Sequence, residues 1–582
     1  DYLFTNKSSN GDYTNNFIEG LLTQDPHGKL IAGMATEWSH NDDASEWYFT
    51  IRDDAVWSTA SGEEYDAVTA EDFVTGMKHA ADSKSETLGL VVDLIAGLRE
   101  YSEGTGSWED VGVKADGNKL TYTLTKPCAY FDGMTTYGIL FPVNAEFLES
   151  KGSDFGAVEP DSILYNGCYI LSSLVPSQEV RFDANPNYYD AANVSRFERL
   201  TVTMISDQAI AFQLYQNREL DEIDLNESTI TTITSDPNNE YNSQLCEKRA
   251  RPSAYAMHFN YQKNNADGTP DVNWNKAIAN TAFRQCFYRG LDLKAWFSRY
   301  NKINPLKCEN DYYTMKGLCY NTQGAEYTTL VAKEMGFDAE KYDGETMIRL
   351  RANGGDISAL KKQAMEELSA IGVTFPVKAT YFIIASSTSA LDNATILKQC
   401  FSDSFGDDFI KLDIQTYVSS LTQEVRTPQL QSFVINGWSA DFGDPVNFLG
   451  QETLHDDNAF YSHYYSNIAR VAEAPADYQK DLMDAFEQYT DLVNTANAIV
   501  NDTDARYEAF AKAEAYMLEN VLVSPTYYDI AWSLTHANEY SKINAMYGGC
   551  NYKAVNWETS EEAYTTVQYE QFAKAFDAAI QG

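Results

Sequence analysis

The chain has 582 residues, of which 44% are hydrophobic and 13% aromatic, and this composition indicates a globular protein with several domains. Its formal net charge is −42, so it has no basic surplus with which to bind nucleic acid or an anionic lipid surface. No apolar run approaches the roughly 18 residues of a membrane-spanning helix.

The first part of the chain has the pattern of short strands separated by turns, with isolated helices. Apolar and polar residues alternate over 47–52 and 119–124, and both segments are predicted to be strands. Thr69 and Asp72 form a capping box, which predicts a helix beginning directly after Thr69.

A second block of elements follows near residue 166. Residues 167–171 and 179–182 predict a β-hairpin, and residues 199–204 predict a strand. Residues 208–216 predict a helix.

The third block is rich in helices. One helix is predicted from an apolar stripe at helical spacing, formed by Ile357, Leu360, Ala364, Leu368 and Ile371. Gly372 is well placed to end this helix, and residues 377–384 predict a strand directly after it. A helix followed at once by a strand is typical of an α/β fold.

The most distinctive stretch surrounds Trp438. Residues 431–435 have the β-branched and aromatic content of a buried strand, and residues 443–445 have turn chemistry. Between them the chain presents Trp438 and then the carboxylate of Asp441. This arrangement is either a recognition edge for a cationic, extended ligand or a core aromatic followed by a turn-capping Asp.

An amphipathic helix is predicted over residues 506–520, with Phe510, Ala513, Met517 and Leu518 on one side. The run after it contains Pro525, which argues against a continuous central strand there.

The eight cysteines include no Cys-x-x-Cys pair, which excludes zinc ribbons and thioredoxin-type redox sites. Two interpretations stay open for them. They form disulfides, with Cys308 and Cys319 as the first expected pair, or they are small buried hydrophobic residues.

The motifs of common enzymes are missing from the sequence. There is no His-Glu-x-x-His, no Gly-x-Ser-x-Gly and no phosphate-binding glycine loop with Lys. We therefore expect no enzyme, no metal site and no cofactor, although 85 acidic residues do not exclude a glycosidase by counting.

Several segments together resemble the peptide/nickel class of extracellular solute-binding proteins of ABC transporters. They occur in the order of that family: FIEGLL at 17–22, MATEW at 34–38, FTIRDDAVW at 49–57, VTAEDF at 68–73, NGCYIL at 166–171, NPNYY at 185–189, FRQCFYRGLD at 283–292 and NGWSADFGDPVNFL at 436–449. Within the family, segments 62–65, 78–82 and 151–155 are most similar to the oligopeptide binders of Gram-positive bacteria.

The resemblance implies an α/β fold of the two-lobed, periplasmic-binding-protein-like type II, with an inserted domain and a hinge between the lobes. Its expected division is lobe I at 1–40, 166–255 and 525–582, the inserted domain at 41–165, and lobe II at 256–524.

The resemblance also implies a ligand-binding site. An extended peptide would pair with a strand edge at Asn436, Gly437, Trp438 and Ser439, and Asp441 would accept its α-ammonium group. Trp438 would pack against the peptide or wall a side-chain pocket. The facing edge from lobe I would be a strand formed by Asn6, Lys7 and Ser8.

The expected function is that of the extracellular oligopeptide-binding component of an ABC importer. Its expected partners are an oligopeptide and the permease subunits, and we expect a monomer. We expect an export signal and a lipid anchor to lie outside this chain, which would place the protein on the cell surface. The alternatives are a binder of an oligosaccharide or a metal chelate on the same fold, and a hydrolase.

Overall fold

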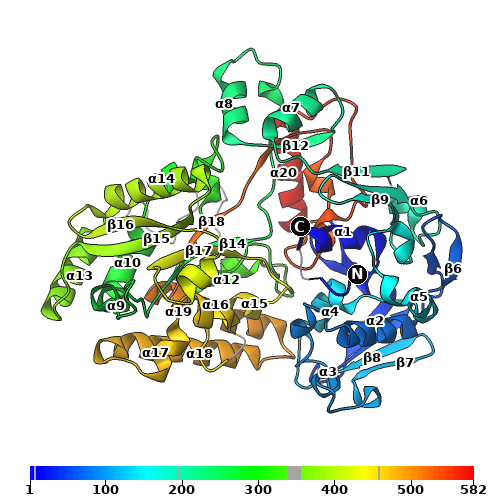
Figure 1. The fold of residues 1–582 in the computed structure, drawn as a ribbon, viewed down its shortest axis with the longest axis horizontal. Coiled ribbons are helices and arrows are strands. Elements are labelled where there is room, and N and C mark those ends of the chain that lie inside the picture. Colours follow the sequence, from blue (N-terminus) through cyan, green and yellow to red (C-terminus); the bar gives the residue numbers. More distant parts are fainter. Residues whose placement is uncertain (6–7, 195, 338–355, 457–458, 582) are drawn as a thin grey trace.

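The computed structural model describes residues 1–582 except 6–7, 195, 338–355, 457–458 and 582. It is a mixed helix and sheet structure with two main bodies, joined near the top of the view in Figure 1. We call the body on the right, with the small unit at the top, lobe I, and the body on the left lobe II. Two crossing segments, 248–253 and 529–531, connect the lobes.

Lobe I begins with helix α1 (Ser8–Phe17) and contains a four-stranded antiparallel sheet in the order β3-β4-β8-β7. The bounds of its sheet strands and main helices are β3 Ala35–His40, β4 Glu46–Ile51, α2 Ala70–Asp82, β7 Val113–Asp116, β8 Lys119–Thr123, α4 Phe131–Met134, β9 Tyr169–Val175, β10 Glu179–Ala184 and β11 Arg199–Thr203. One continuous core holds both Leu3 and Ile18 and residues of the predicted inserted domain, such as Trp47 and Phe73. The boundaries expected for that domain stay a prediction.

The small unit of lobe I lies beside the crossing segments. Its sheet has the order β12-β19-β13, and helices α7, α8 and α20 surround it (Figure 1). The bounds are α7 Gln208–Gln216, β12 Glu222–Leu225, α8 Glu227–Ser235, β13 Cys246–Glu247, β19 Trp532–Thr535 and α20 Thr566–Gln581.

Lobe II contains the antiparallel sheet β17-β14-β18 and the parallel pair β15-β16, with helices packed around them. The bounds are β14 Ala254–Phe259, α9 Val272–Ala279, α10 Thr281–Gly290, α12 Tyr327–Glu334, α13 Ser358–Ala370, β15 Val377–Ile384, α14 Thr388–Phe405, β16 Ile410–Tyr417, β17 Phe433–Trp438, α16 Phe460–Tyr464, α17 Ile468–Glu473, α18 Lys480–Asn497, α19 Thr503–Asn520 and β18 Ser524–Tyr528. A second continuous core lies in this lobe.

The local sequence patterns are confirmed. The capping box of Thr69 and Asp72 forms at the start of α2, and the predicted helix over 208–216 has those bounds in α7. The predicted strand over 377–384 is β15, and Gly372 ends the preceding helical segment with a φ of +82°.

Pro525 lies within strand β18, which is not a central strand, and the expectation is confirmed. The order β17-β14-β18 places β18 at an edge of its sheet, and its pairing with β14 shifts register between Tyr255 and Ala256, beside Pro525. A strand tolerates proline at an edge or a bulge, because no ladder hydrogen bond is lost there.

The expected Cys308–Cys319 disulfide is wrong. All eight cysteines are free and buried, so the second interpretation, small buried hydrophobic residues, is the one that the structure bears out. Among the helices that the structure describes, none is both long and apolar enough to cross a membrane.

The two crossing segments run side by side and form a hinge. The Lys248 backbone N–H donates to the Ala531 carbonyl at 2.9 Å, and the Arg251 N–H donates to the Asp529 carbonyl at 2.9 Å. Both connections are short and hydrogen-bonded to one another, so a rotation of one lobe against the other would change the backbone angles of these few residues.

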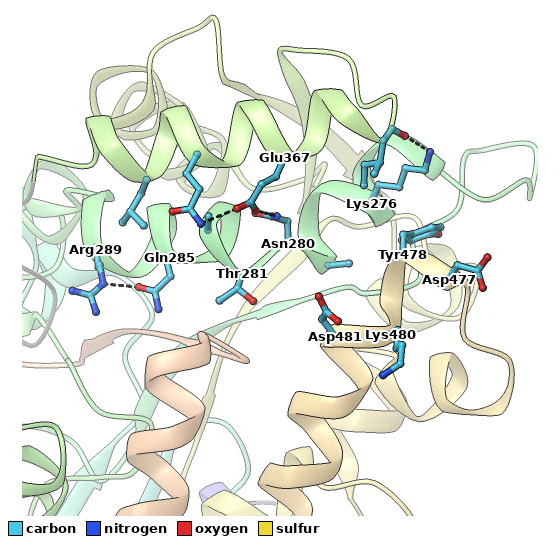
Figure 2. A pocket seen from close by; sticks show the side chains of 15 residues that line it. Lys276, Asn280, Thr281, Gln285, Arg289, Glu367, Asp477, Tyr478, Lys480 and Asp481 are labelled. Carbon is cyan, nitrogen blue, oxygen red and sulfur yellow. Dashed lines mark hydrogen bonds between the residues drawn. The ribbon is translucent and has the colours of Figure 1, made fainter.

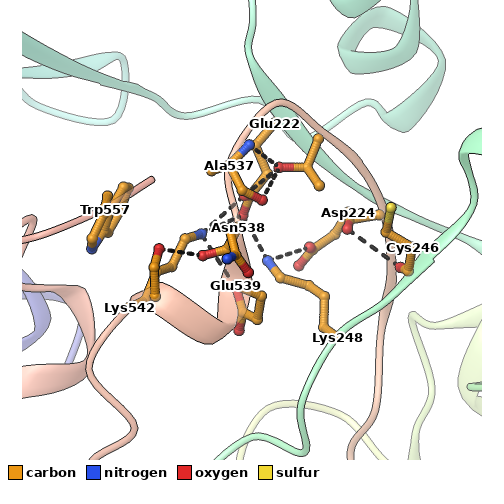
Figure 3. Close-up of polar contacts among 12 residues, drawn as sticks. Glu222, Asp224, Cys246, Lys248, Ala537, Asn538, Glu539, Lys542 and Trp557 are labelled. Atoms are coloured by element: carbon orange, nitrogen blue, oxygen red, sulfur yellow. Dashed lines mark hydrogen bonds and ion pairs between the residues drawn. The ribbon is translucent and has the colours of Figure 1, made fainter. Parts of the chain in front are cut away.

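A charge network on the lobe I side anchors the hinge (Figure 3). The Glu222 carboxylate accepts from Lys248 at 2.8 Å and from Lys542 at 2.9 Å, and Asp224 accepts from Lys248 at 3.0 Å. Burial alone would raise the pKa of Glu222, but the two lysines lower it far below its usual range. Arg251 extends the network to Asp224 and Asp529, at 3.0 and 3.3 Å.

Candidate ligand-binding site

A cavity of about 360 Å³ lies between the lobes, and we call it the cleft cavity. Lobe I lines it with Thr14 and Asn15 of α1 and with Tyr137, among others. The hinge and lobe II contribute Arg251, Ser253, Tyr255, Ser439, Asp441 and Asp529. A concave site at a domain interface, with a few charged groups among neutral ones, is typical of small-ligand binding.

Strand β17 brings the sequence-predicted residues to this region. It is the other edge strand of the sheet β17-β14-β18, and the chain leaves it at Trp438 to form the turn that contains Asp441. Ser439 and Asp441 line the cleft cavity, whereas Asn436, Gly437 and Trp438 are not among its lining residues.

Trp438 is half-buried and packs against the core of lobe II. Its ring lies edge-on to Tyr461, with a centroid distance of 5.6 Å, and its indole N–H donates to Asn447 Oδ1 at 2.7 Å. These contacts match the core interpretation of this residue, which was one of the two that the sequence left open.

Gly437 is held by its neighbours. Its carbonyl accepts from the Asn436 side-chain amide at 3.0 Å and from the Tyr461 hydroxyl at 3.1 Å, which uses both lone pairs. A Cβ at this position would lie 2.7 Å from Tyr255 Cε1, so the Tyr255 ring, which stacks on Tyr527, requires glycine here. In this conformation the carbonyl is not available to pair with a peptide backbone.

Asp441 presents a carboxylate that has no cationic partner among the described residues. Within that part of the chain its side chain accepts a hydrogen bond from Asn447 Nδ2, at 3.2 Å, and no Lys, Arg or His nitrogen lies within 4 Å of it. Burial raises the pKa of Asp441, and the Asn447 hydrogen bond opposes this rise. A carboxylate in such an environment is stabilised by any cation that enters the cavity.

Asn447 contacts Asp441, and the sequence did not single it out. Its Oδ1 accepts from the Asp441 N–H and the Trp438 indole, while its Nδ2 donates to the Asp441 carboxylate. Asn447 lies in the segment 436–449 that the sequence singled out, but its hydrogen bonds to Asp441 are seen only in the folded turn.

The turn itself is anchored by a buried ion pair. Arg506 of α19 donates two hydrogen bonds to the Asp444 carboxylate, at 2.7 and 2.9 Å, and both side chains are 3% exposed. Arg506 also donates to the carbonyls of Asn497 and Ile499. The expectation that residues 443–445 form the turn that holds the site is consistent with this pair.

The expected strand at Asn6, Lys7 and Ser8 is not confirmed. Asn6 and Lys7 lie outside the described residues, and Ser8 is the first residue of helix α1. Asn and Ser are depleted in strands and common at helix starts, which fits this outcome. Helix α1 therefore contributes Thr14 and Asn15 to the lobe I wall of the cavity, beside loop residues such as Thr87 and Gly548.

The lobes touch beside the cleft cavity. The rings of Tyr130 from lobe I and Phe442 from lobe II stack with a centroid distance of 4.1 Å and an interplanar angle of 7°. Tyr547 of lobe I pairs with Ala440 in a parallel β-bridge. Its ring covers Gly443, where a Cβ would lie 2.3 Å from Tyr547 Cε1.

A second interlobe cavity, of about 760 Å³, lies beyond these contacts, and we call it the second chamber. Its lining includes Tyr130, Asp132, Gly443, Asp444 and Tyr547. Burial raises the pKa of Asp132 to about 6.

A larger depression, of about 890 Å³, lies on the outer face of lobe II (Figure 2). Several of its polar side chains already have hydrogen-bond partners: Asn280 donates to Glu367 at 2.6 Å, and Lys276 donates to the backbone carbonyl of Ile371 at 2.7 Å. It shares no lining residue with the cleft cavity, and we assign it no ligand. Within the described ranges, no group of three or more His, Cys, Asp or Glu side chains is arranged to hold a metal ion.

Comparisons with known proteins place these features in context. The model of the bacterial extracellular solute-binding proteins, family 5 middle, matches residues 29–459. The oligopeptide-binding protein AliB of Streptococcus pneumoniae is 30% identical over 90% of this chain and 82% of its own length. For the oligopeptide-binding protein SarA of Streptococcus gordonii, the identity is 31% over 90% of this chain and 81% of that protein.

Solved structures show the same fold. Listeria monocytogenes OppA bound to peptide superposes with a TM-score of 0.62 at 20% identity, covering 96% of this chain and 97% of that one. The substrate-binding domain of an oligopeptide ABC transporter from Bacillus anthracis gives a TM-score of 0.63 at 19% identity, covering 96% of both chains.

Proposed function

Because the chain belongs to the family 5 bacterial extracellular solute-binding proteins, we propose that it captures oligopeptides between its lobes as the binding component of an ABC importer. One observation carries this proposal: the cleft cavity is lined from both lobes and presents the Asp441 carboxylate, which no cation of the described residues neutralises. A peptide with a free N-terminus supplies that cation. The names of the relatives AliB and SarA, both oligopeptide-binding proteins, point to the same ligand class.

Asp441 is the residue that gives the site its chemical specificity. The α-ammonium group is common to all unblocked peptides, so a protein that takes many sequences can recognise it regardless of side chains. The pair formed by ammonium and carboxylate is a charge-assisted hydrogen bond, which is stronger than a neutral one. Asn447 fixes the carboxylate in place through its own hydrogen bond.

The other charged groups of the cleft cavity are already compensated. Asp529 pairs with Arg251 at 3.3 Å, and Arg251 also pairs with Asp224 at 3.0 Å. The rest of the lining is formed by neutral groups such as Thr14, Asn15, Tyr137 and Tyr255. A neutral, hydroxyl-rich wall suits water-mediated contacts with side chains of different kinds.

Capture is coupled to closure of the lobes about the hinge. The peptide contacts both lobes, so it stabilises the closed arrangement by its additional contacts there. The closed protein then delivers the peptide to the permease subunits, and the protein acts as a monomer held at the cell surface by a lipid anchor. It is a binding protein and carries out no chemistry on its ligand.

Native mass spectrometry of the purified protein tests the proposal. We expect co-purified peptides whose masses disappear after partial unfolding, dialysis and refolding. Isothermal titration of the stripped protein with a tetrapeptide library should then show saturable binding. Binding of oligosaccharides or metal chelates in place of peptides, or turnover of peptides or glycosides, would identify one of the alternative functions and refute this one.

A further inference from the structure

The two interlobe cavities are separated by a thin partition built from neighbouring residues of the same two segments. Ala440 and Asp441 line the cleft cavity, whereas Gly443 and Asp444 line the second chamber. On the lobe I side, Gly548 lines the first cavity and Tyr547 the second. The boundary therefore runs through Phe442, the residue directly after Asp441.

Aromatic rings close this boundary. Phe442 stacks flat on Tyr130, at 4.1 Å, and Tyr130 lines the second chamber. The Tyr547 ring covers Gly443 and also lies 3.4 Å from the position of a Cβ on Gly133. Because Gly443 and Gly133 have no side chains, the Tyr547 ring packs closely against both lobes. These rings therefore separate the two cavities.

The partition lies next to the group that binds the peptide's N-terminus. We propose that the Phe442–Tyr130 stack is the end wall of the peptide site: it limits the bulk that the terminal nitrogen can carry, and so selects peptides with an unsubstituted N-terminus. This inference rests on the proposed function. Asp441 provides the attraction for the ammonium group, and the Phe442 ring provides the steric limit behind it.

If the Phe442–Tyr130 stack is removed, the net charge of the second chamber favours entry of a cationic group. Arg506 compensates Asp444, and the other charged residues of the lining are Asp25, Asp132 and Lys29. These side chains leave one negative charge in excess, so a cationic extension is not repelled from the chamber.

The test removes the Phe442 ring from the protein and supplies a ring of the same size on the peptide. The substitution Phe442→Ala removes a benzyl group, and a peptide that carries a benzyl group on its terminal nitrogen offers the same group from the other side. Reductive benzylation keeps the positive charge on that nitrogen, so the modification changes bulk and not charge. We would measure binding of a tetrapeptide library, unmodified and N-benzylated, by equilibrium dialysis with mass-spectrometric detection.

For the wild-type protein we expect N-benzylation to weaken binding by more than about tenfold, which is the factor that about 1.4 kcal/mol represents. For Phe442→Ala we expect the penalty to fall to within about threefold, since the cavity left by the ring accepts the benzyl group. Phe442→Tyr keeps the ring and should keep the wild-type penalty. Tyr130→Ala removes the other half of the stack and should also reduce it.

Two results would overturn the inference. One is wild-type protein that binds N-benzylated and unmodified peptides equally well. The other is a penalty that stays unchanged in both Phe442→Ala and Tyr130→Ala while circular dichroism shows that the variants are folded. Failure of the wild-type protein to bind the unmodified library is a different outcome, because it would refute the proposed function and not the role of the wall.

Discussion

The exchange of Asp441 for Asn tests the ammonium site most directly. The substitution keeps the shape of the side chain and an oxygen that accepts from Asn447 Nδ2, so the turn is preserved. It removes only the charge. Because no cation in the described part of the chain neutralises Asp441, its ion pair with the peptide forms only on binding, and the loss of this pair lowers the affinity by its full free energy.

The expected size follows from the burial of the site. Removing one partner of a buried ion pair costs about 3–5 kcal/mol, and the half-buried Asp441 lies at the lower end, about 3 kcal/mol or roughly 150-fold in Kd. N-acetylation of the peptide removes the other partner. In a double-mutant cycle of Asp441→Asn with N-acetylation, we therefore expect a coupling energy of about 3 kcal/mol.

Isothermal titration with four combinations of protein and peptide supplies the cycle. Asp529→Asn is the matched control, since Asp529 lines the same cavity but already has Arg251 as its partner. For this control we expect a coupling energy with N-acetylation close to zero. An equal loss on acetylation in wild type and in Asp441→Asn would refute the assigned role of Asp441.

Three further results are expected. Peptide affinity should rise with pH up to the raised pKa of Asp441, by at most about tenfold per pH unit, because ammonium binding requires the carboxylate and expels its proton. Arg506→Met should lower the free energy of unfolding in urea by about 3–5 kcal/mol, because Asp444 is left buried without its cation. Gly437→Ala should cost about 1–3 kcal/mol in the same assay, because its Cβ would overlap Tyr255.

Each of these results has a control within the chain. The pH dependence should vanish in Asp441→Asn, and its persistence would assign the proton to another group. Arg99→Met removes an exposed pair with Asp93 and should leave the free energy of unfolding nearly unchanged. Gly450→Ala places its Cβ 3.7 Å from Val446 Cγ2, so a loss as large as that of Gly437→Ala would contradict the steric explanation.

Much of the fold could be predicted because the relevant signals are local. The capping box of Thr69 and Asp72 and the helix Gln208–Gln216 depend on residues within one or two turns. The start of the first helix and both ends of the second were predicted. The strand that contains Pro525 could not be predicted, because its edge position and its register shift depend on pairing with β14, more than 250 residues away.

The site was predictable only in part for the same reason. Asp441 and Ser439 were found from the segment in which they lie, and the structure places both at the cleft cavity. Asn447 was missed, because its role is defined by two hydrogen-bond partners and not by its residue type. Ser8 was expected in a strand by positional analogy alone, and the structure places it in α1.

The reactivity of the eight buried thiols reports on local unfolding of the protein core. Burial raises the pKa of every one of them, so a thiol-specific reagent should react only with molecules whose core has opened. Three lie in the core of lobe I (Cys128, Cys168 and Cys550), four in that of lobe II (Cys286, Cys308, Cys319 and Cys400), and Cys246 beside α20. The order in which they are alkylated at increasing urea concentration would show which lobe unfolds first. The same measurement with bound peptide would show whether binding protects both lobes or only one.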